Sequence, residues 1–537
     1  MVNAGSLGWL GVGSALVFLT LRLNAPPLTW VAMAIVYHAS RAMPLVSGPV
    51  LLWLGLYVAF AAGQRGILPL AGAAYFALVA LTTSEMALPF VLDRVAGPRL
   101  IGVASTLVFP AAWVAVEFLR SRLTSAGTWG AIGYSQYGNL AVMQVAAFVG
   151  IWGISFLIAW FASTLNWAWA RGFAWPAVRT PVLTYLAVFS VALIVSTARL
   201  ALAPTDRPSI RVATLNRPVD LFVPGEMTRI SEGRVAVDER ARIDEKLARL
   251  HDWFLEGSRR EARAGARLIV WPEQNLLVFS EDEPAFLDRA RRLAAQEGVY
   301  LAMGMGTIHR GDALPFENKL VLVDPSGRIA VSYLKSHPVR GWEAGIMKPG
   351  DGRLPVVSTS AGRMGVAICF DGDFPEFVRQ AAVGRADFLI LPVNDWKEVK
   401  DLHFRMAAFR AVETGVPMIR AATSGLSSAF DPWGRVLGLS DYFSAGDRTM
   451  TVQLPVGGVR TLYAKTGDLF AWLCVAGLLV GLGLAAASTA DSPHLSATIG
   501  STRATRHRPT DFTGVASGHA KASVGDVGCG GTPTPIS

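Results

Sequence analysis

Three residues that together could form and break an acyl bond each stand just after a short apolar run. Cys369 follows the run Gly365 to Ile368, and Glu273 and Lys335 follow similar runs earlier in the chain. A cysteine attacks a carbonyl best as its thiolate, whose formation is favoured by a nearby ammonium group and by a base that takes the proton. Lys335 and Glu273 could fill these two roles. The pattern indicates covalent acyl transfer through a thioester.

The attacked carbonyl would become an oxyanion, which the lysine charge and a backbone N–H such as that of Phe370 would stabilise. Taken alone, each residue has an ordinary structural explanation, because an isolated cysteine in an apolar strand usually packs in the core and a single lysine is usually solvated. The functional interpretation depends on all three residues lying at strand ends of one domain.

The segment from about 208 to 455 alternates short strand-like runs with helical patterns. This alternation predicts an α/β layered domain of about 250 residues. The expected helices are 239–264 and 283–297. The expected strands are 210–215, 267–271, 300–304, 319–323, 329–333, 365–370, 388–392 and 418–422.

The whole chain is too apolar for an ordinary soluble protein. Of its 537 residues, 52% are hydrophobic and only 17% are charged, and a bilayer crossing needs about 20 apolar residues. About seven spans are expected in 1–204 and one more in 467–488. The first is expected to be a retained helix, because it lacks the charged leader of a signal peptide. The expected N-terminal spans are 6–23, 28–38, 45–63, 67–92, 100–119, 140–170 and 181–202.

The tail 489–537 is rich in Ser, Thr, Gly, Pro and His and is predicted to be disordered.

Arginines in the short loops are nearly balanced between the two sides of the spans. Arginines of the tail close to the last span favour a cytoplasmic tail, so that with eight spans the domain 208–455 faces outward. The loop arginines are Arg22, Arg65, Arg120 and Arg122 on one side, and Arg41, Arg94, Arg99, Arg171 and Arg179 on the other.

Two acidic residues lie inside apolar runs. Glu117 precedes Arg120 by three positions, so an ion pair on one helical face is expected. Glu85 has no such neighbour, and the sequence assigns it no role.

The charge and cysteine content exclude several classes of protein. The net charge of +9 does not indicate nucleic-acid binding, because the basic residues are scattered. Cys369, Cys474 and Cys529 suggest neither a disulfide framework nor a zinc site. His337 and His403 lack a third ligand at suitable spacing, so no metal or other cofactor is expected.

The order Glu273, Lys335, Cys369 resembles the catalytic triad of the nitrilase, or carbon-nitrogen hydrolase, superfamily. The resemblance covers about 208 to 455 and implies an αββα sandwich. Further agreement lies in Asn394-Asp395-Trp396, His403, and the segments 405–413, 417–422 and 431–435.

Membrane attachment makes the chain similar to the apolipoprotein N-acyltransferase family, which has several N-terminal spans, an extracytoplasmic nitrilase-like domain and one final span. Segments 113–120, 133–136 and 150–156 resemble that family's helices, and Glu343 stands where it carries a second essential glutamate. The resemblance implies a monomeric multi-pass enzyme of the bacterial cytoplasmic membrane. It would move an acyl chain from a phospholipid to the N-terminal amine of a diacylglyceryl-cysteine on a lipoprotein.

The resemblance also implies roles for individual residues. Glu273 would deprotonate Cys369, and Lys335 would stabilise each tetrahedral intermediate. Glu343 would position the lysine or the substrate. The expected supporting or substrate-binding residues are Glu343, Phe370, Asp371, Asn394 and Trp396.

The chain differs from the family pattern around the substrate. Phe370 and Asp371 stand where the family has an aromatic hydroxyl and a glutamate, and only 34 positions separate Lys335 from Cys369, which indicates a trimmed lipid-contacting arm. Three hypotheses stay open: a lipoprotein N-acyltransferase, a membrane-anchored amidase or acyltransferase of the same superfamily with another substrate, and a noncatalytic membrane scaffold.

Overall fold

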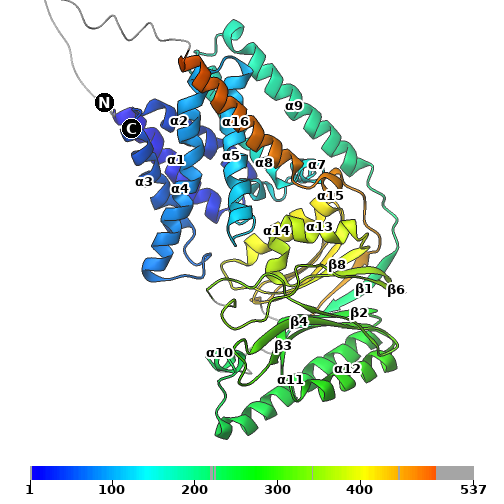
Figure 1. Ribbon diagram of the computed structural model, residues 1–537. Helices are drawn as coiled ribbons and strands as arrows, with labels where there is room; N and C mark the ends of the chain where they lie inside the picture. The colour runs from blue at the N-terminus through cyan, green and yellow to red at the C-terminus, as the bar shows by residue number, and fades with distance from the viewer. Residues whose placement is uncertain (1–2, 218–221, 223–224, 342, 445–447, 491–537) are drawn as a thin grey trace, which may run out of the picture. The chain divides into compact units, whose positions relative to one another are not determined.

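A computed structural model describes residues 3–217, 222, 225–341, 343–444 and 448–490. Figure 1 shows the arrangement of the helices and strands. The prediction of disorder for the tail falls outside the described residues from position 491 onward.

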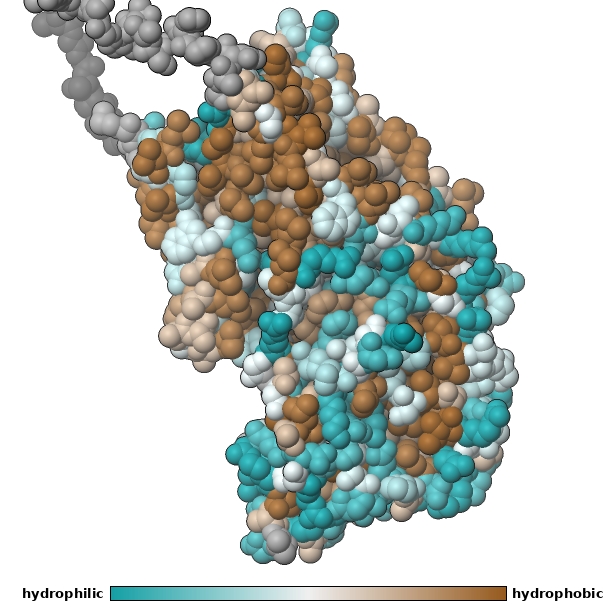
Figure 2. All heavy atoms as spheres, viewed as in Figure 1, coloured by the Kyte–Doolittle hydropathy of each residue, from teal (hydrophilic) through white to brown (hydrophobic). Residues whose placement is uncertain are grey.

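The N-terminal part of the chain forms a bundle of long apolar helices, which a last helix near the C-terminus joins (Figure 1). Hydrophobic side chains cover most of this bundle in Figure 2, whereas polar residues dominate the surface around α10 to α12. The long helices are α1 (Ala4–Arg22), α2 (Pro26–Ala42), α3 (Ser47–Gly63), α4 (Gly72–Ala96), α5 (Val103–Leu123), α8 (Ile151–Trp169), α9 (Trp175–Ala201) and α16 (Leu469–Ala490).

Six of the described helices are long and apolar enough to cross a membrane, and the other two, α2 and α3, have 17 residues each. Because a helix rises about 1.5 Å per residue, 17 residues reach about 25 Å, close to the thickness of the hydrocarbon core. The expectation of about eight spans is therefore met only in part, because six of the described helices qualify and α2 and α3 are shorter.

The expected span 140–170 is wrong as a single helix. Two one-turn helices, α6 (Leu140–Met143) and α7 (Ala146–Val149), precede α8. Gly150, between α7 and α8, has φ +70°, and a Cβ there would lie 2.6 Å from the Tyr463 ring. The left-handed conformation at Gly150 ends one helix and starts the next, which a periodicity argument does not detect.

Residues 209–455 contain two six-stranded sheets that face each other. One sheet has the order β12-β1-β2-β3-β4-β5 and the other β11-β10-β9-β8-β7-β6. β1, β2 and β3 are parallel, as are β7, β8 and β9. The strands are β1 (Ser209–Thr214), β2 (Leu268–Phe279), β3 (Tyr300–Ile308), β4 (Phe316–Val323), β5 (Ile329–Leu334), β6 (Val356–Thr359), β7 (Gly362–Val366), β8 (Phe388–Asn394), β9 (Met418–Thr423), β10 (Leu426–Phe430), β11 (Val436–Asp441) and β12 (Met450–Pro455).

Side chains of β2 alternate between two cores, as the period of a strand requires. Leu268 and Val270 belong to the core that the two sheets share, whereas Ile269 and Trp271 pack toward the helices. Helices α11 (Val237–Arg263) and α12 (Glu283–Glu297) cover one sheet, and α13 (Pro375–Val383) and α14 (Lys400–Thr414) cover the other (Figure 1). The predicted αββα sandwich is confirmed.

The eight expected strands all exist, with different boundaries. The strand expected at 365–370 spans 362–366 instead, because the chain turns into a 3-10 helix, Cys369–Asp373. β6, β10, β11 and β12 were not predicted from the sequence. Of these, β6 and β11 lie largely at the surface, where apolar runs are short.

Direct hydrogen bonds join the helical bundle to the sandwich. The Ile151 N–H at the start of α8 donates to the buried carboxylate of Glu413 in α14 at 2.8 Å, and the Thr128 N–H, in the loop after α5, donates to the carbonyl of Asp373 at 3.2 Å. A buried carboxylate at a helix N-terminus satisfies an otherwise unpaired backbone N–H. These bonds fix the bundle and the sandwich against each other.

The predicted ion pair between Glu117 and Arg120 is wrong. Glu117 accepts hydrogen bonds from Trp113 Nε1 at 2.8 Å and from the Ile132 N–H at 2.9 Å. Arg120 donates to the carbonyl of Trp129 instead. Both side chains therefore shape the turn between α5 and the following 3-10 helix, Ile132–Gln136.

Candidate active site

Glu273 lies inside β2 and not after its end. The pairing of β2 with β3 shifts register between Trp271 and Leu276, and Gln274 in the shifted segment has φ +52°. Gly304 of β3 faces this irregularity, where a Cβ would lie 2.2 Å from the Pro272 carbonyl oxygen. A bulge of this kind redirects a side chain that regular pairing would place elsewhere. The expected strand end is wrong, but an irregular backbone at Glu273 is present.

Lys335 follows directly after β5, and the strand β4 holds its backbone. The Lys335 N–H donates to the Asn318 carbonyl at 2.9 Å. The buried ammonium donates to Glu273 Oε1 at 2.8 Å and to Glu343 Oε2 at 2.7 Å. Two buried carboxylates therefore hold one ammonium group in a fixed position.

Cys369 opens the tight turn that follows β7. Its φ of +46° is unusual for a residue other than glycine, and such backbone strain gathers at functional sites. Its sulfur lies 4.0 Å from the carbonyl oxygen of Asn394, at the end of β8. The turn thus directs the thiol across the carboxyl ends of two neighbouring parallel strands.

The charges of the three groups are strongly coupled. Burial raises the pKa of the Cys369 thiol well above its usual value, and the carboxylate of Glu273 adds to this rise while Lys335 opposes it. Burial also raises the pKa of Glu273, against the opposing effect of Lys335. Burial alone would lower the pKa of Lys335, but Glu273 and Glu343 raise it well above the usual value. The resting site therefore contains a neutral thiol beside a permanent ammonium group.

Two further groups orient the Glu273 carboxylate. Asn318 Nδ2 donates to Oε1 at 2.6 Å, and the Asn394 N–H donates to Oε2 at 2.8 Å. Asn318 was not among the predicted site residues, although an amide side chain inside an apolar strand is a sequence signal for it. That strand was expected to start at Lys319, directly after Asn318, whereas β4 starts at Phe316.

Glu343 contacts the site through Lys335 and through the backbone. Besides the ammonium group, Oε2 accepts from the Val339 N–H at 2.9 Å, and Oε1 accepts from Gln274 at 3.2 Å. The structure therefore brings Glu343 to the triad, as the sequence analysis expected.

Asp371 joins the cysteine turn to the lysine segment. One oxygen accepts from the Tyr333 hydroxyl at 2.7 Å and from the Ile368 N–H at 3.1 Å. The other accepts from the N–H and from Nδ1 of His337, at 2.9 Å and 2.8 Å. Because these partners flank both Lys335 and Cys369, Asp371 holds the two reactive residues in register.

Of the other expected supporting residues, Phe370 packs edge-on against Phe374 at 5.2 Å between ring centres. Trp396 donates from Nε1 to the carbonyl of Gly66, in the loop between α3 and α4, at 2.8 Å. Trp396 therefore contacts the helical bundle. Asn394 touches the triad through its backbone.

A second buried network lies behind the cysteine turn. His403 pairs with Asp395 at 2.8 Å and with Asp373 at 3.3 Å, and Arg420 donates to Asp395 at 2.5 Å. Burial alone would lower the pKa of His403, but Asp373 and Asp395 raise it to about 9. A cavity of about 10 Å³ between this network and Cys369 has room for about one water molecule.

Comparison with known protein families gives two matches. Residues 240–463 match the carbon-nitrogen hydrolase family, and residues 11–164 match the apolipoprotein N-acyltransferase N-terminal domain. The first match covers all the residues of the candidate site, and the second covers most of the helical bundle.

Similar curated proteins include the apolipoprotein N-acyltransferase of Geobacter metallireducens, 30% identical over 414 residues, with 72% of this chain and 75% of that protein covered. The apolipoprotein N-acyltransferase of Rhodopseudomonas palustris is 27% identical, with 80% and 82% covered. Among solved structures, an amidase from Nesterenkonia sp. is 22% identical with a TM-score of 0.37, and the match covers 47% of this chain and 93% of the amidase.

Proposed function

This chain belongs to the apolipoprotein N-acyltransferase family, and on that premise we propose that it moves an acyl chain from a phospholipid, through a Cys369 thioester, to the N-terminal amine of a lipoprotein's diacylglyceryl-cysteine. The observation that carries the proposal is the buried contact of Lys335 with both Glu273 and Glu343 beside the strained Cys369 turn. This arrangement supplies a base, a nucleophile and a fixed positive charge.

In the first half-reaction, Glu273 takes the Sγ proton of Cys369 while the sulfur attacks the ester carbonyl. The raised thiol pKa means that deprotonation accompanies the attack instead of preceding it. Lys335 and the Phe370 N–H stabilise the oxyanion. The carbon–oxygen bond then breaks, the departing lysophospholipid oxygen takes the proton from Glu273, and the thioester remains.

In the second half-reaction, the lipoprotein amine attacks the thioester carbonyl and Glu273 accepts a proton from the nitrogen. The carbon–sulfur bond breaks, the sulfur regains the proton, and the product is an amide. Because both substrates are lipid-anchored, an enzyme fixed in the same membrane meets them at a high effective concentration.

We further propose that the enzyme lies in the bacterial cytoplasmic membrane with the sandwich on the outer side, acting as a monomer. One feature supports this orientation. Arg503, Arg506 and Arg508 follow α16 in the sequence, and α16 starts beside the sandwich and ends at the opposite end of the bundle (Figure 1), so positive charge there favours a cytoplasmic location for that end. The loop arginines themselves are balanced, because Arg199, which donates to the carbonyl of Pro432, adds a fifth arginine to the sandwich side.

The experiment uses a strain that lacks its own N-acyltransferase. Wild type should add one acyl group to a lipoprotein N-terminus, as mass spectrometry of the N-terminal peptide measures, and Cys369→Ala should add none. Cys474→Ala is the matched control, because that buried cysteine lies in α16. Acylation by Cys369→Ala would contradict the thioester route, and release of free fatty acid by wild type without acylation would indicate a hydrolase.

A further inference from the structure

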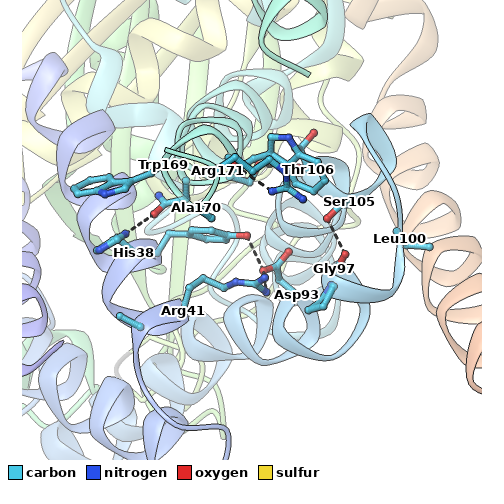
Figure 3. Close-up of a pocket in the computed structure, with 16 residues that line it drawn as sticks. His38, Arg41, Asp93, Gly97, Leu100, Ser105, Thr106, Trp169, Ala170 and Arg171 are labelled. Atoms are coloured by element: carbon cyan, nitrogen blue, oxygen red, sulfur yellow. Dashed lines mark hydrogen bonds and ion pairs between the residues drawn. The ribbon is translucent and has the colours of Figure 1, made fainter. Parts of the chain in front are cut away.

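A cavity of about 420 Å³ lies within the helical bundle, outside the candidate active site. It is bounded by the C-terminal ends of α2, α4 and α8 and by the start of α5 (Figure 3). Its exposed rim includes Pro98, Trp169, Ala170 and Arg171.

The cavity is far from the thiol. α5 runs from Ser105 at the cavity to Leu123, and after the next turn Trp129 donates to Asp373 of the sandwich. Eighteen residues of helix span about 27 Å, which is almost the thickness of the hydrocarbon core. α8 also runs from the sandwich to the cavity, because Ile151 at its start contacts the sandwich and Asn166 near its end lines the cavity. The cavity therefore lies at the opposite headgroup level, too far from Cys369 to hold the acyl donor of the reaction.

Positive charge predominates in the cavity. Arg41 pairs with Asp93 at 3.3 Å, and Tyr37 also donates to that carboxylate, at 2.7 Å. Arg171, 3.2 Å from the centre of the Trp167 ring, forms no ion pair with any residue that the structure describes. Burial and the positive charge of Arg41 both lower the pKa of Arg171. The lining thus holds two guanidinium groups and one carboxylate, and the site can accept an anion.

Two buried polar atoms of the lining have no hydrogen-bond partner among the described residues. They are the donor Nε1 of Trp167 and the acceptor Oδ1 of Asp93. Buried polar groups without partners are rare and costly. A phosphate oxygen would satisfy the indole, and a hydroxyl or ammonium group on the same ligand would satisfy the carboxylate. The geometry therefore suits a headgroup that carries a phosphate and a hydrogen-bond donor.

The surroundings indicate where such a ligand comes from. Trp169 is partly exposed and stacks on His38 with ring centres 4.1 Å apart, and Ile101, next to the cavity residue Leu100, is 89% exposed. Tryptophan and arginine beside exposed aliphatic side chains mark the headgroup region of a bilayer, and basic pockets between membrane helices bind lipid headgroups.

We propose that this cavity binds the phosphate headgroup of a membrane phospholipid from the leaflet opposite the sandwich. Arg41 and Arg171 contact the phosphate, and Asp93 accepts from the headgroup alcohol. The bound lipid contacts the ends of α2, α4 and α8 and stabilises their packing.

The test measures phospholipid retention by the purified full chain in detergent, with native mass spectrometry and thermal unfolding. The probes are phosphatidylglycerol, diacylglycerol as a lipid without phosphate, and inorganic phosphate. The cavity variant is Arg41→Gln with Arg171→Gln. The matched control is Arg99→Gln with Arg179→Gln, which removes two exposed arginines of the same end that do not line the cavity.

Wild type and the control should retain phosphatidylglycerol and unfold at higher temperature in its presence, and the cavity variant should lose at least tenfold in affinity. If the double variant does not fold, Arg171→Gln alone, which breaks no ion pair, should show a weaker loss in the same direction. Equal retention by the cavity variants would overturn the proposal. Stabilisation by diacylglycerol equal to that by phosphatidylglycerol would also overturn it, because the acyl chains alone would then explain binding. Equal stabilisation by inorganic phosphate would overturn it as well, because the ligand would then be a soluble anion.

Discussion

The indole Nε1 of Trp129, in the loop after α5, donates a 2.5 Å hydrogen bond to Oδ2 of Asp373, four positions after Cys369. The neighbouring Thr128 N–H and hydroxyl both donate to the backbone carbonyl of Asp373, at 3.2 Å and 3.0 Å. The helical bundle therefore holds the cysteine turn directly, and the membrane part of the protein contributes to the geometry of the candidate site.

Trp129→Phe should lower the acyl-transfer rate about tenfold or more, because a hydrogen bond to a charged partner contributes about 1.5–3 kcal/mol. The measurement is formation of the Cys369 thioester under single-turnover conditions. Trp53→Phe removes another indole hydrogen bond, to Ser84 within the bundle, and should change the rate little. An unchanged rate in Trp129→Phe would show that the turn keeps its geometry without the bundle.

Glu273→Gln should lower the rate about 10²- to 10⁴-fold, because it removes the proposed base. Glu343→Gln should have a smaller effect on chemistry, since Glu343 reaches the reacting atoms only through Lys335. Both variants unbalance a buried ion cluster, so thermal unfolding of each is needed beside the rate. Equal rates for Glu273→Gln and wild type, at equal stability, would eliminate Glu273 as the base.

Asp371→Asn should reduce the rate with little change in KM, because the fully buried carboxylate of Asp371 positions the turn. Its carboxylate accepts four hydrogen bonds, and an amide can accept only at its single oxygen. Tyr333→Phe removes one of these bonds and serves as the graded comparison. A rise in KM without loss of rate would instead place Asp371 at the substrate.

The stability of the protein should fall between about pH 7 and 9 because of His403. Its pKa of about 9 in the folded protein lies above the unfolded value of about 6.5. The stability from its protonated form is therefore fully present below the unfolded pKa and lost as the pH rises through about 9, a change of about 3 kcal/mol.

Thermal unfolding at several pH values measures this loss, and His403→Gln should flatten it. His251→Gln is the control, because burial lowers the pKa of His251 and its titration falls below the same range. A slope that His403→Gln leaves unchanged would assign the pH dependence to other groups.

The sequence by itself determined the class of the protein and the identity of its reactive residues. Hydrophobic runs of span length located the bundle, and the order Glu273, Lys335, Cys369 on an α/β pattern indicated the sandwich and its chemistry. These features are local, because hydropathy, strand period and side-chain type are all read from neighbouring residues.

Only the tertiary structure showed how the site is held together. The bulge that directs Glu273, the contact of Asn318 with it, and the hydrogen bond from Trp129 to Asp373 each depend on residues far apart in the chain. The cavity in the bundle likewise depends on residues far apart in the chain, because the ends of four helices form it. Such contacts arise when packing brings distant backbone segments together, so no property of a single segment predicts them.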